Sequence, residues 1–336
     1  MAYGAYLFGC GGPYLELDEA KFFSDSNPFG FILFSRNVES QEQLRRLTGD
    51  LRDAVGRDAP ILVDQEGGRV QRLPPPLWRD WPSPLEQCEG LAEAAAARAM
   101  WIRYRLISSE LRDCGINSNC VPMADVATKS THPVVKDRCY GYHAERVARL
   151  ARAAAEGTVA GGVLPVLKHI PGHGRPFADS HVELPRTSAS LDELDSVDFY
   201  TFSTLSDLPL GMTAHVVYKS VDRDHPATQS PSVIKLIRER IGFNGLLMTD
   251  DISMSALSGG IEERCVASIG AGCDLVLHCN GNLDEMKAVA EAAGDLTKSA
   301  RVSADCVRNS LRAQLEPLDA AELDKEFRQI LRTKSN

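Results

Sequence analysis

Two apolar segments of this sequence end in side chains that could carry out acid–base chemistry. The segment Leu246–Met248 leads to Asp250, so a buried strand there would end in a carboxylate. Another apolar run ends at Lys168-His169 and continues into a glycine-rich loop that contains Asp179-Ser-His181. A carboxylate can act as a nucleophile or a base, and a histidine with a carboxylate partner exchanges protons near neutral pH. Because Asp179 and His181 are two residues apart, their side chains face the same way in an extended loop. These segments predict an acid–base site.

Polar residues follow the other apolar runs as well, at Ser35-Arg36-Asn37, Asp64-Gln65-Glu66, Asp125, Asp137-Arg138, His215, His278 and Asn280. In barrel enzymes the catalytic groups come from the carboxyl ends of several strands. A rim of carboxylates, guanidiniums and amides suits a polyhydroxylated substrate, because these groups pair with vicinal hydroxyls as acceptors and donors.

The elements that must position these residues alternate along the whole chain. We expect strands at Tyr6–Gly9, Gly30–Phe34, Ile61–Asp64, Ile116–Pro122, Leu164–His169, Leu210–Val216, Leu246–Asp250 and Asp274–His278. Helical periodicity separates them, for example at Leu44, Leu47 and Leu51, with Ser40 and Gly56 as the expected caps. This alternation predicts an α/β fold, a (β/α)8 TIM-type barrel. The competing prediction is a doubly wound open sheet. It is less favoured because this sequence has no GxGxxG motif after the first strand.

No segment rich in Pro, Gly or Ser divides the chain, so we expect a single catalytic domain over residues 1–336, with an extra C-terminal helix from about residue 300.

A net charge of -9 argues against a nucleic-acid partner. The nine cysteines lack regular spacing and indicate free thiols in a reducing compartment. No run approaches the roughly 20 apolar residues of a membrane span, so we expect a cytoplasmic protein that does not bind membranes.

Five stretches resemble glycoside hydrolase family 3, in particular its single-domain bacterial β-N-acetylglucosaminidases (β-hexosaminidases) of peptidoglycan recycling. They are Gly30-Phe-Ile-Leu-Phe-Ser-Arg-Asn37, Val63-Asp-Gln-Glu-Gly-Gly-Arg-Val-Gln-Arg72, Lys168-His-Ile-Pro-Gly-His-Gly174 with Asp179-Ser-His181, Met212-Thr-Ala-His-Val216 and Thr249-Asp-Asp-Ile-Ser-Met254. The sequence departs from the family pattern at Lys136, where glycine is usual, and at Ile170, where phenylalanine is common.

The resemblance implies a retaining exo-β-N-acetylglucosaminidase that removes terminal N-acetylglucosamine from anhydromuramyl peptides. Asp250 would be the nucleophile, His181 the acid/base and Asp179 its partner. The residues implied to hold the sugar are Asp64, Arg72, Arg138, Lys168 and His169. The resemblance implies a monomer that needs neither a cofactor nor a metal.

Four other functions stay open at this stage. One is a phosphorylase of the same family, because a histidine acid/base is neutral in one of its two protonation states and then repels incoming phosphate less than a carboxylate would. The others are a metal-dependent barrel hydrolase using His169, His173, His181 and Asp250, a sugar-binding protein without activity, and catalysis assisted by the substrate's acetamido group. That last mechanism uses an adjacent acidic pair, and Asp250-Asp251 fits it poorly because neighbouring side chains of an extended strand point apart.

Several neighbouring residues have structural interpretations. We expect Asp251 to be a helix N-cap, His173 to order its loop, and His215 to support the site rather than catalyse. We expect Glu66 to brace its loop through backbone amides and Cys279 to be a small core residue.

Overall fold

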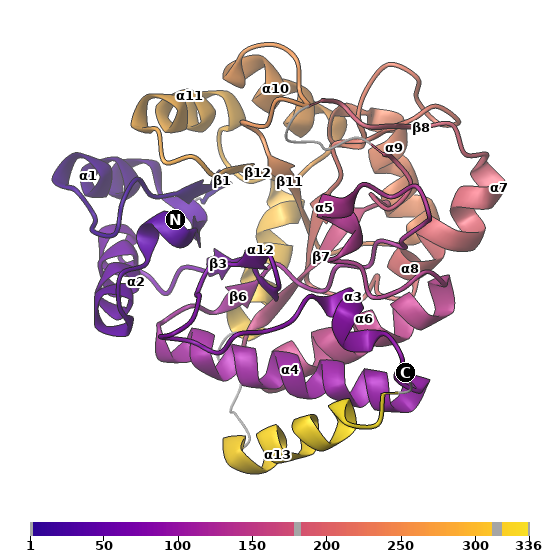
Figure 1. Ribbon diagram of the computed structural model, residues 1–336. Coiled ribbons are helices and arrows are strands. Elements are labelled where there is room, and N and C mark those ends of the chain that lie inside the picture. Colours follow the sequence, from indigo (N-terminus) through magenta and orange to yellow (C-terminus); the bar gives the residue numbers. More distant parts are fainter. Residues whose placement is uncertain (1–2, 178–182, 311–317, 335–336) are drawn as a thin grey trace.

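The strands form one closed barrel in the computed structural model, which describes residues 3–177, 183–310 and 318–334 (Figure 1). Its eight strands are β1 (Gly4–Gly9), β2 (Pro28–Leu33), β3 (Ile61–Val63), β6 (Ser118–Asn119), β7 (Leu164–Ile170), β9 (Leu210–Thr213), β11 (Leu246–Asp251) and β12 (Leu275–His278). All neighbouring pairs are parallel, and β1 closes the barrel between β2 and β12. The predicted (β/α)8 barrel is confirmed, with a strand at each of the eight predicted positions, although the fourth and sixth strands are shorter than predicted.

The barrel strands are short apolar runs because both of their faces are covered. Every residue of β1, β2 and β7 is buried. The fourth strand is shorter than predicted, since only Ser118–Asn119 forms regular pairs. Pro122 has no amide hydrogen to donate to a neighbouring strand, although its carbonyl still accepts a hydrogen bond from the Lys168 amide at 3.1 Å.

A helical segment follows each barrel strand and lies outside the barrel. These segments are α1 (Leu17–Ser26), α2 (Gln41–Val55), α4 (Glu93–Asp113), α6 (Ala144–Ala160), the run of α7 (Leu191–Glu193), η2 (Leu194–Phe199) and α8 (Tyr200–Ser203), the run of α9 (Pro231–Leu236) and η4 (Ile237–Ile241), α10 (Ile261–Ala271), and α11 (Leu283–Ala293). Short turns of helix lie in the loops at η1 (Ser35–Asn37), α3 (Pro84–Cys88), α5 (Pro133–Lys136) and η3 (Ala227–Gln229).

The expected helix caps are present in α2. The Ser40 hydroxyl accepts a hydrogen bond from the Gln43 amide, which satisfies one of the free amides of the first turn. Gly56 ends the helix in the left-handed conformation, with a φ of 61°, where a side chain would be unfavourable. Local sequence therefore sets both ends of this helix.

Two further helices follow the barrel, α12 (Lys298–Ser310) and α13 (Ala320–Leu331). In α13, Phe327 packs edge-on against Trp81, with ring centroids 5.5 Å apart, and Glu326 forms an ion pair with Arg98 of α4. Among the described helices, none is both long and apolar enough to cross a membrane.

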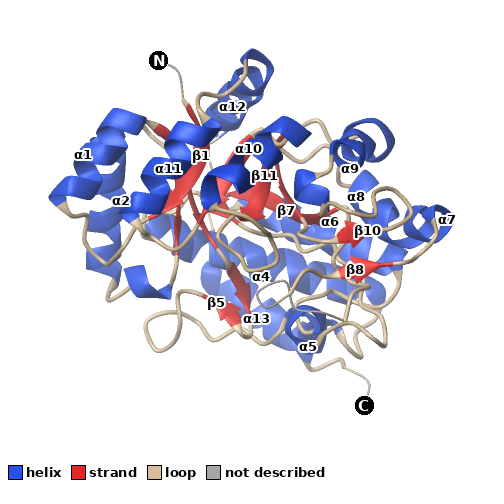
Figure 2. Cartoon of the chain, turned by 90° about the horizontal axis from the view of Figure 1, so that it is seen from above, coloured by secondary structure: helices blue, strands red, loops and turns tan. Residues whose placement is uncertain are grey.

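The long loops gather at the carboxyl end of the barrel. Figure 2 shows β5, β8, β10 and α5 on one side of the molecule, and α12 on the opposite side. β4 (Gln65–Gly67) and β5 (Val70–Gln71) form an antiparallel hairpin after β3, while β8 (Arg186–Thr187) pairs in parallel with β10 (Val217–Tyr218). This end is where the site must lie if the predicted residues work together.

Candidate active site

The carboxyl ends of the strands enclose a cavity of about 300 Å³. The predicted residues Asp64, Arg72, Arg138, Lys168, His169 and Asp250 all line it, together with Arg69, His173 and Asp251. Its apolar lining comes from Ile32, Phe34, Val70, Val134, Val135, Met212, Met254, Leu277 and Cys279. Residues from seven separate stretches of sequence thus meet in one place.

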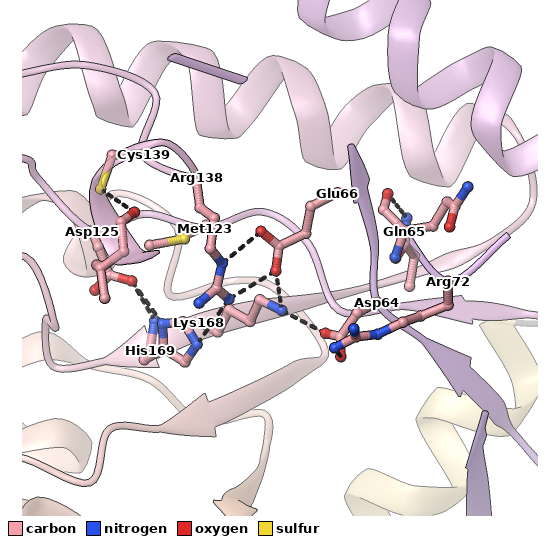
Figure 3. Close-up of polar contacts among 12 residues, drawn as sticks. Asp64, Gln65, Glu66, Arg72, Met123, Asp125, Arg138, Cys139, Lys168 and His169 are labelled. Atoms are coloured by element: carbon pink, nitrogen blue, oxygen red, sulfur yellow. Dashed lines mark hydrogen bonds and ion pairs between the residues drawn. The ribbon is translucent and has the colours of Figure 1, made fainter. Parts of the chain in front are cut away.

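Lys168 holds the two carboxylates of the β3 segment. It lies in β7, and its Nζ contacts Oδ1 of Asp64 at 2.7 Å and Oε1 of Glu66 at 2.6 Å (Figure 3). Arg72 reaches the other oxygen of Asp64 from the end of the hairpin, at 3.2 Å. An ammonium that is almost fully buried needs such partners to remain charged.

Arg138 forms a two-pronged pair with Glu66, a geometry that fixes a guanidinium firmly. Its Nε and Nη2 donate to the two carboxylate oxygens at 2.9 and 2.8 Å. The same Nη2 lies 3.4 Å from Nε2 of His169. The expectation that Glu66 braces its loop through backbone amides is wrong. The carboxylate, only 1% exposed, binds Arg138 and Lys168 instead.

Asp125 orients His169 and the loop that follows it. Its Oδ2 accepts from the ring Nδ1 of His169 at 2.7 Å and from the backbone amide of the same residue at 3.2 Å. Its Oδ1 accepts from the amide of His173 at 2.5 Å. We call Asp64, Glu66, Arg72, Asp125, Arg138, Lys168 and His169 the charge network (Figure 3).

The carboxylate of Asp250, near the end of β11, is oriented by the next residue, Asp251. The amide of Asp251 donates to Asp250 Oδ1 at 2.8 Å. Within the part of the chain that the structure describes, Oδ2 of Asp250 accepts no hydrogen bond. Asp251 itself caps a turn, since its carboxylate accepts from the amide of Ser253 at 3.0 Å and from its hydroxyl at 2.7 Å. The prediction that Asp251 is a helix N-cap is therefore wrong: it caps a turn, and the next helix, α10, begins only at Ile261 with Gly260 as its N-cap.

Opposite charges keep the carboxylates of the cavity ionised. Burial opposes ionisation, but Arg138 and Lys168 lower the pKa of Glu66 to about 2. Burial likewise opposes ionisation of Asp64, yet Lys168 and Arg72 bring its pKa below the usual range. The pKa of Asp250 is also lowered, against the effect of burial, by His169 nearby. Asp250 is thus an anion at neutral pH, as a nucleophile must be.

The pKa values of His173 and His215 are lowered as well, which favours the uncharged form of a histidine. Burial, and then the neighbouring His169, lower the pKa of His173 to about 4. Burial lowers the pKa of His215 as well. Both rings are therefore neutral at pH 7. The ring of His215 is hydrogen-bonded at both nitrogens, whereas Nδ1 of His173 has no partner among the described residues.

The remaining sequence predictions divide into three groups. Asp179 and His181 lie outside the described residues. Cys279 is buried as expected, but it also lines the cavity. Asp125 and Arg69 belong to the site although no individual role was predicted for them. Asp125 was one of the polar residues noted after the apolar runs, and Arg69 lies in the stretch Val63–Arg72 that resembles the family.

The alternative of a metal centre used three histidines and Asp250. His169, His173 and Asp250 do line the same cavity. Among the described residues, however, no three His, Cys, Asp or Glu side chains are arranged to hold a metal ion. His181 is not part of that statement, because it lies outside those residues.

Comparisons with known proteins identify the family of this chain. The model of the glycosyl hydrolase family 3 N-terminal domain matches residues 16–311. A curated relative, the β-hexosaminidase of Methylococcus capsulatus, is 35% identical over 315 residues, which cover 91% of this chain and 92% of the relative. The structure is similar to NagZ of Neisseria gonorrhoeae in complex with N-trifluoroacetyl-D-glucosamine, with a TM-score of 0.85, 30% identity, and 100% and 99% of the two chains covered.

A family 3 β-N-acetylglucosaminidase of Paenibacillus sp. has a TM-score of 0.86 at 27% identity, covering 98% of this chain and 67% of the other. The chain therefore belongs to glycoside hydrolase family 3 and, within it, to the β-hexosaminidases.

Proposed function

We propose that the protein is a retaining exo-β-N-acetylglucosaminidase that removes terminal N-acetylglucosamine from peptidoglycan fragments, the anhydromuramyl peptides. The observation that carries this proposal is the ionised Asp250 carboxylate in a cavity lined by the hydroxyl-binding groups of the charge network. The names of the relatives support the choice of sugar, since they include β-hexosaminidases and a NagZ in complex with a glucosamine derivative.

In the proposed first step, Asp250 Oδ2 attacks the anomeric carbon. The bond from that carbon to the leaving oxygen breaks, and a proton from His181 goes to the leaving oxygen. In the second step the deprotonated His181 takes a proton from water, whose oxygen displaces Asp250 from the sugar. Two inversions give net retention. The acid/base role of His181 and the supporting role of Asp179 rest on the family motif, because both residues lie outside the described part of the chain.

Asp64, Arg72, Arg138, Lys168 and His169 are proposed to bind the sugar. Lys168 and Arg138 are held by carboxylates before any ligand arrives. Groups that are already in position lose little entropy on binding, so more of their interaction energy is available to the transition state.

Arg69 supports the choice of an anionic aglycone. Its side chain is 48% exposed and lies 3.8 Å from Asp137, at the outer limit of an ion pair. It lines the cavity from the β4–β5 hairpin, so it can offer a cation to a ligand carboxylate. Anhydromuramyl peptides carry carboxylates on the part of the molecule beyond the scissile bond.

The bonding of Asp251 argues against assistance by the substrate's acetamido group. That mechanism needs a second acid to polarise the acetamide. Both oxygens of Asp251 already accept hydrogen bonds, from Ser253 and from the amide of Cys279 at 3.2 Å. Direct attack by Asp250 is the mechanism that this arrangement favours.

Hydrolysis of 4-nitrophenyl N-acetyl-β-D-glucosaminide beside the plain β-glucoside, in buffer with EDTA, tests the proposal. We expect selective cleavage of the N-acetyl substrate that Asp250→Ala abolishes and EDTA leaves unchanged. The control variant Asp305→Ala, which removes a carboxylate 63% exposed on α12, should keep wild-type activity. Mass spectrometry after reaction with a fluorinated glycoside should locate the adduct on Asp250.

Three results would contradict the proposal. Loss of activity with EDTA would indicate a metal-dependent hydrolase, and a sugar 1-phosphate formed in phosphate buffer would indicate a phosphorylase. An active enzyme that forms no adduct on Asp250 would indicate acetamido assistance.

A further inference from the structure

A chain of buried polar side chains runs from the end of β9 to the residue beside the proposed nucleophile. The hydroxyls of Thr213 and Thr228 are 2.8 Å apart, and the Thr228 hydroxyl is 2.7 Å from Nδ1 of His215. Nε2 of His215 is 3.0 Å from the backbone carbonyl oxygen of Asp251. Each of these three side chains is fully buried, and none of them lines the cavity.

The partners of His215 determine which ring nitrogen carries the proton. A carbonyl oxygen only accepts, so Nε2 must donate to Asp251. If the ring is neutral, Nδ1 is then an acceptor, and the Thr228 hydroxyl must donate to it. The Thr228 hydroxyl has only one proton to donate. Donation to the Ala214 carbonyl at 3.2 Å is therefore a weaker alternative to donation to Nδ1 of His215 at 2.7 Å. Thr213 in turn can donate to Thr228, which completes the chain.

His215 thereby secures the residue that orients Asp250. Asp251 is held from both sides, by His215 after β9 and by the Cys279 amide after β12. These are the strands that flank β11 in the barrel. The amide of Asp251 is the donor to Asp250 Oδ1 at 2.8 Å. Any rotation of Asp251 would turn that amide and change the direction of the nucleophile.

We propose that His215 is a positioning residue for the reaction: a neutral ring with its proton on Nε2, oriented by Thr228, that holds Asp251 and through it the carboxylate of Asp250. This inference rests on the proposed role of Asp250 as nucleophile. Burial favours the neutral ring by lowering the pKa of His215, while the nearby Asp250 and Asp251 carboxylates act in the opposite direction and His169 in the same one. His215 does not touch the substrate under this proposal.

Substitutions along the chain test the proposal. His215→Ala should lower kcat on the activated aryl N-acetylglucosaminide by about 10- to 100-fold, because small misplacements of reacting groups cost factors of this size. His215→Gln should recover much of the loss, because its amide nitrogen can replace Nε2 as the donor. KM should change little, since the sugar-binding residues are untouched.

Thr228 provides the more specific variant, because its hydroxyl bonds to Thr213, His215 and Ala214 rather than to Asp250 or Asp251. Thr228→Val should lower kcat by about tenfold, since a ring without its oriented donor can flip or change tautomer, and Thr228→Ser should restore it. The control is Thr158→Val, which removes an equally buried hydroxyl from α6, bonded there to Ala154 at 2.8 Å. The control should keep wild-type kcat, and thermal unfolding of each variant will identify any that fails to fold.

Two readouts separate positioning from a general structural role. Nitrogen NMR of the imidazole, assigned by the signals lost in His215→Gln, should show Nε2 protonated and Nδ1 bare at pH 7. The rate at which the fluorinated glycoside traps Asp250 should fall in His215→Ala and Thr228→Val by the same factor as kcat.

Trapping of Asp250 at the wild-type rate in folded Thr228→Val and His215→Ala would overturn the inference, as would a ring protonated on Nδ1 at pH 7. Failure of the wild-type enzyme to form an adduct on Asp250 would instead overturn the proposed function on which the inference rests.

Discussion

At the scale of single residues, the cavity is prepared for its ligand by pairs of opposite charge. Lys168 and Arg138 share Glu66, and Lys168 also holds Asp64. Each cation therefore has a fixed position before a sugar enters. A site whose dipoles and charges need not reorganise during the reaction stabilises the transition state more effectively than water does.

Arg69 offers a test of the aglycone at the same scale. Arg69→Gln should raise KM for an anhydromuramyl peptide roughly fivefold, which corresponds to about 1 kcal/mol for a partly exposed ion pair. The KM for the neutral aryl N-acetylglucosaminide should stay unchanged, because that substrate has no carboxylate for Arg69. Steady-state kinetics on both substrates will measure the difference.

The matched control is Arg149→Gln, which removes the same charge from an α6 side chain that is 59% exposed and pairs with Glu93. Equal losses of Arg69→Gln on the charged and neutral substrates would show that Arg69 does not recognise the aglycone.

At the scale of elements, the loop after β7 is held on several sides before it reaches the segment that contains Asp179 and His181. The Thr131 hydroxyl donates to the Gly174 carbonyl, and the Tyr218 hydroxyl donates to the Gly172 carbonyl. Arg175 pairs with the buried Asp198 of η2 at 2.5 Å. The start of the loop is thus set by neighbouring elements on either side of it.

The pair α4 and α6 shows how close two outer helices approach. A side chain at Gly157 of α6 would place its Cβ 2.3 Å from the backbone oxygen of Trp101 in α4. Gly157→Ala should therefore lower the free energy of unfolding by about 1–3 kcal/mol, because the backbone would have to move apart. Urea unfolding followed by circular dichroism will measure it.

The control for this prediction is Gly270→Ala in α10, where no atom lies within 4 Å of the added Cβ. That substitution should raise the free energy of unfolding by up to about 1 kcal/mol through helix propensity. A loss of stability as large in Gly270→Ala as in Gly157→Ala would mean that close helix contact is not the cause.

At the scale of the whole molecule, the functional groups are concentrated at one end of the barrel, and the two C-terminal helices lie elsewhere. α13 is held on α4 by the ion pair of Arg98 with Glu326, and on the loop before α3 by the Trp81–Phe327 contact and the ion pair of Arg79 with Asp324. The loop that contacts α13 also bonds to the β4–β5 hairpin, because the Gly68 amide donates to the Trp81 carbonyl at 2.8 Å.

The charge network predicts how the stability of the molecule depends on pH. The pKa values of Asp64, Glu66 and Asp125 are all below their usual range in the folded protein. Groups of this kind stabilise the folded state fully above their unfolded pKa of about 4. That contribution is lost as the pH falls towards the folded values, about 2 for Glu66. The urea midpoint should drop steeply below pH 4.

A carboxamide in place of one carboxylate gives the comparison. Glu66→Gln should have a lower urea midpoint than wild type at pH 7 and should lose less on acidification, while the exposed Glu291→Gln should follow wild type at every pH. Parallel curves for Glu66→Gln and wild type would show that Glu66 contributes nothing to the acid dependence.

Sequence alone predicted the barrel because each of its elements has a strong local signal. The strands are short apolar runs, and α2 has both a capping serine and a terminal glycine. The fourth strand was predicted too long, since apolar periodicity does not report which amides are available for pairing at Pro122. Asp64, Lys168 and Asp250 were noticed because polar side chains follow the strands, and the roles of the site residues came from the resemblance to family 3. Neither source carries information on which side chains pair with one another.

The sequence by itself determined the alternation of strands and helices and, through it, the end of the barrel to which Asp64, Lys168 and Asp250 belong. Only the tertiary structure decided their partners. The ion pair of Lys168 with Asp64 joins residues 104 positions apart, and the support of Asp251 by His215 joins residues 36 apart. Contacts of this kind depend on closure of the barrel and on side-chain rotamers in a packed interior, and no local pattern of residues encodes either.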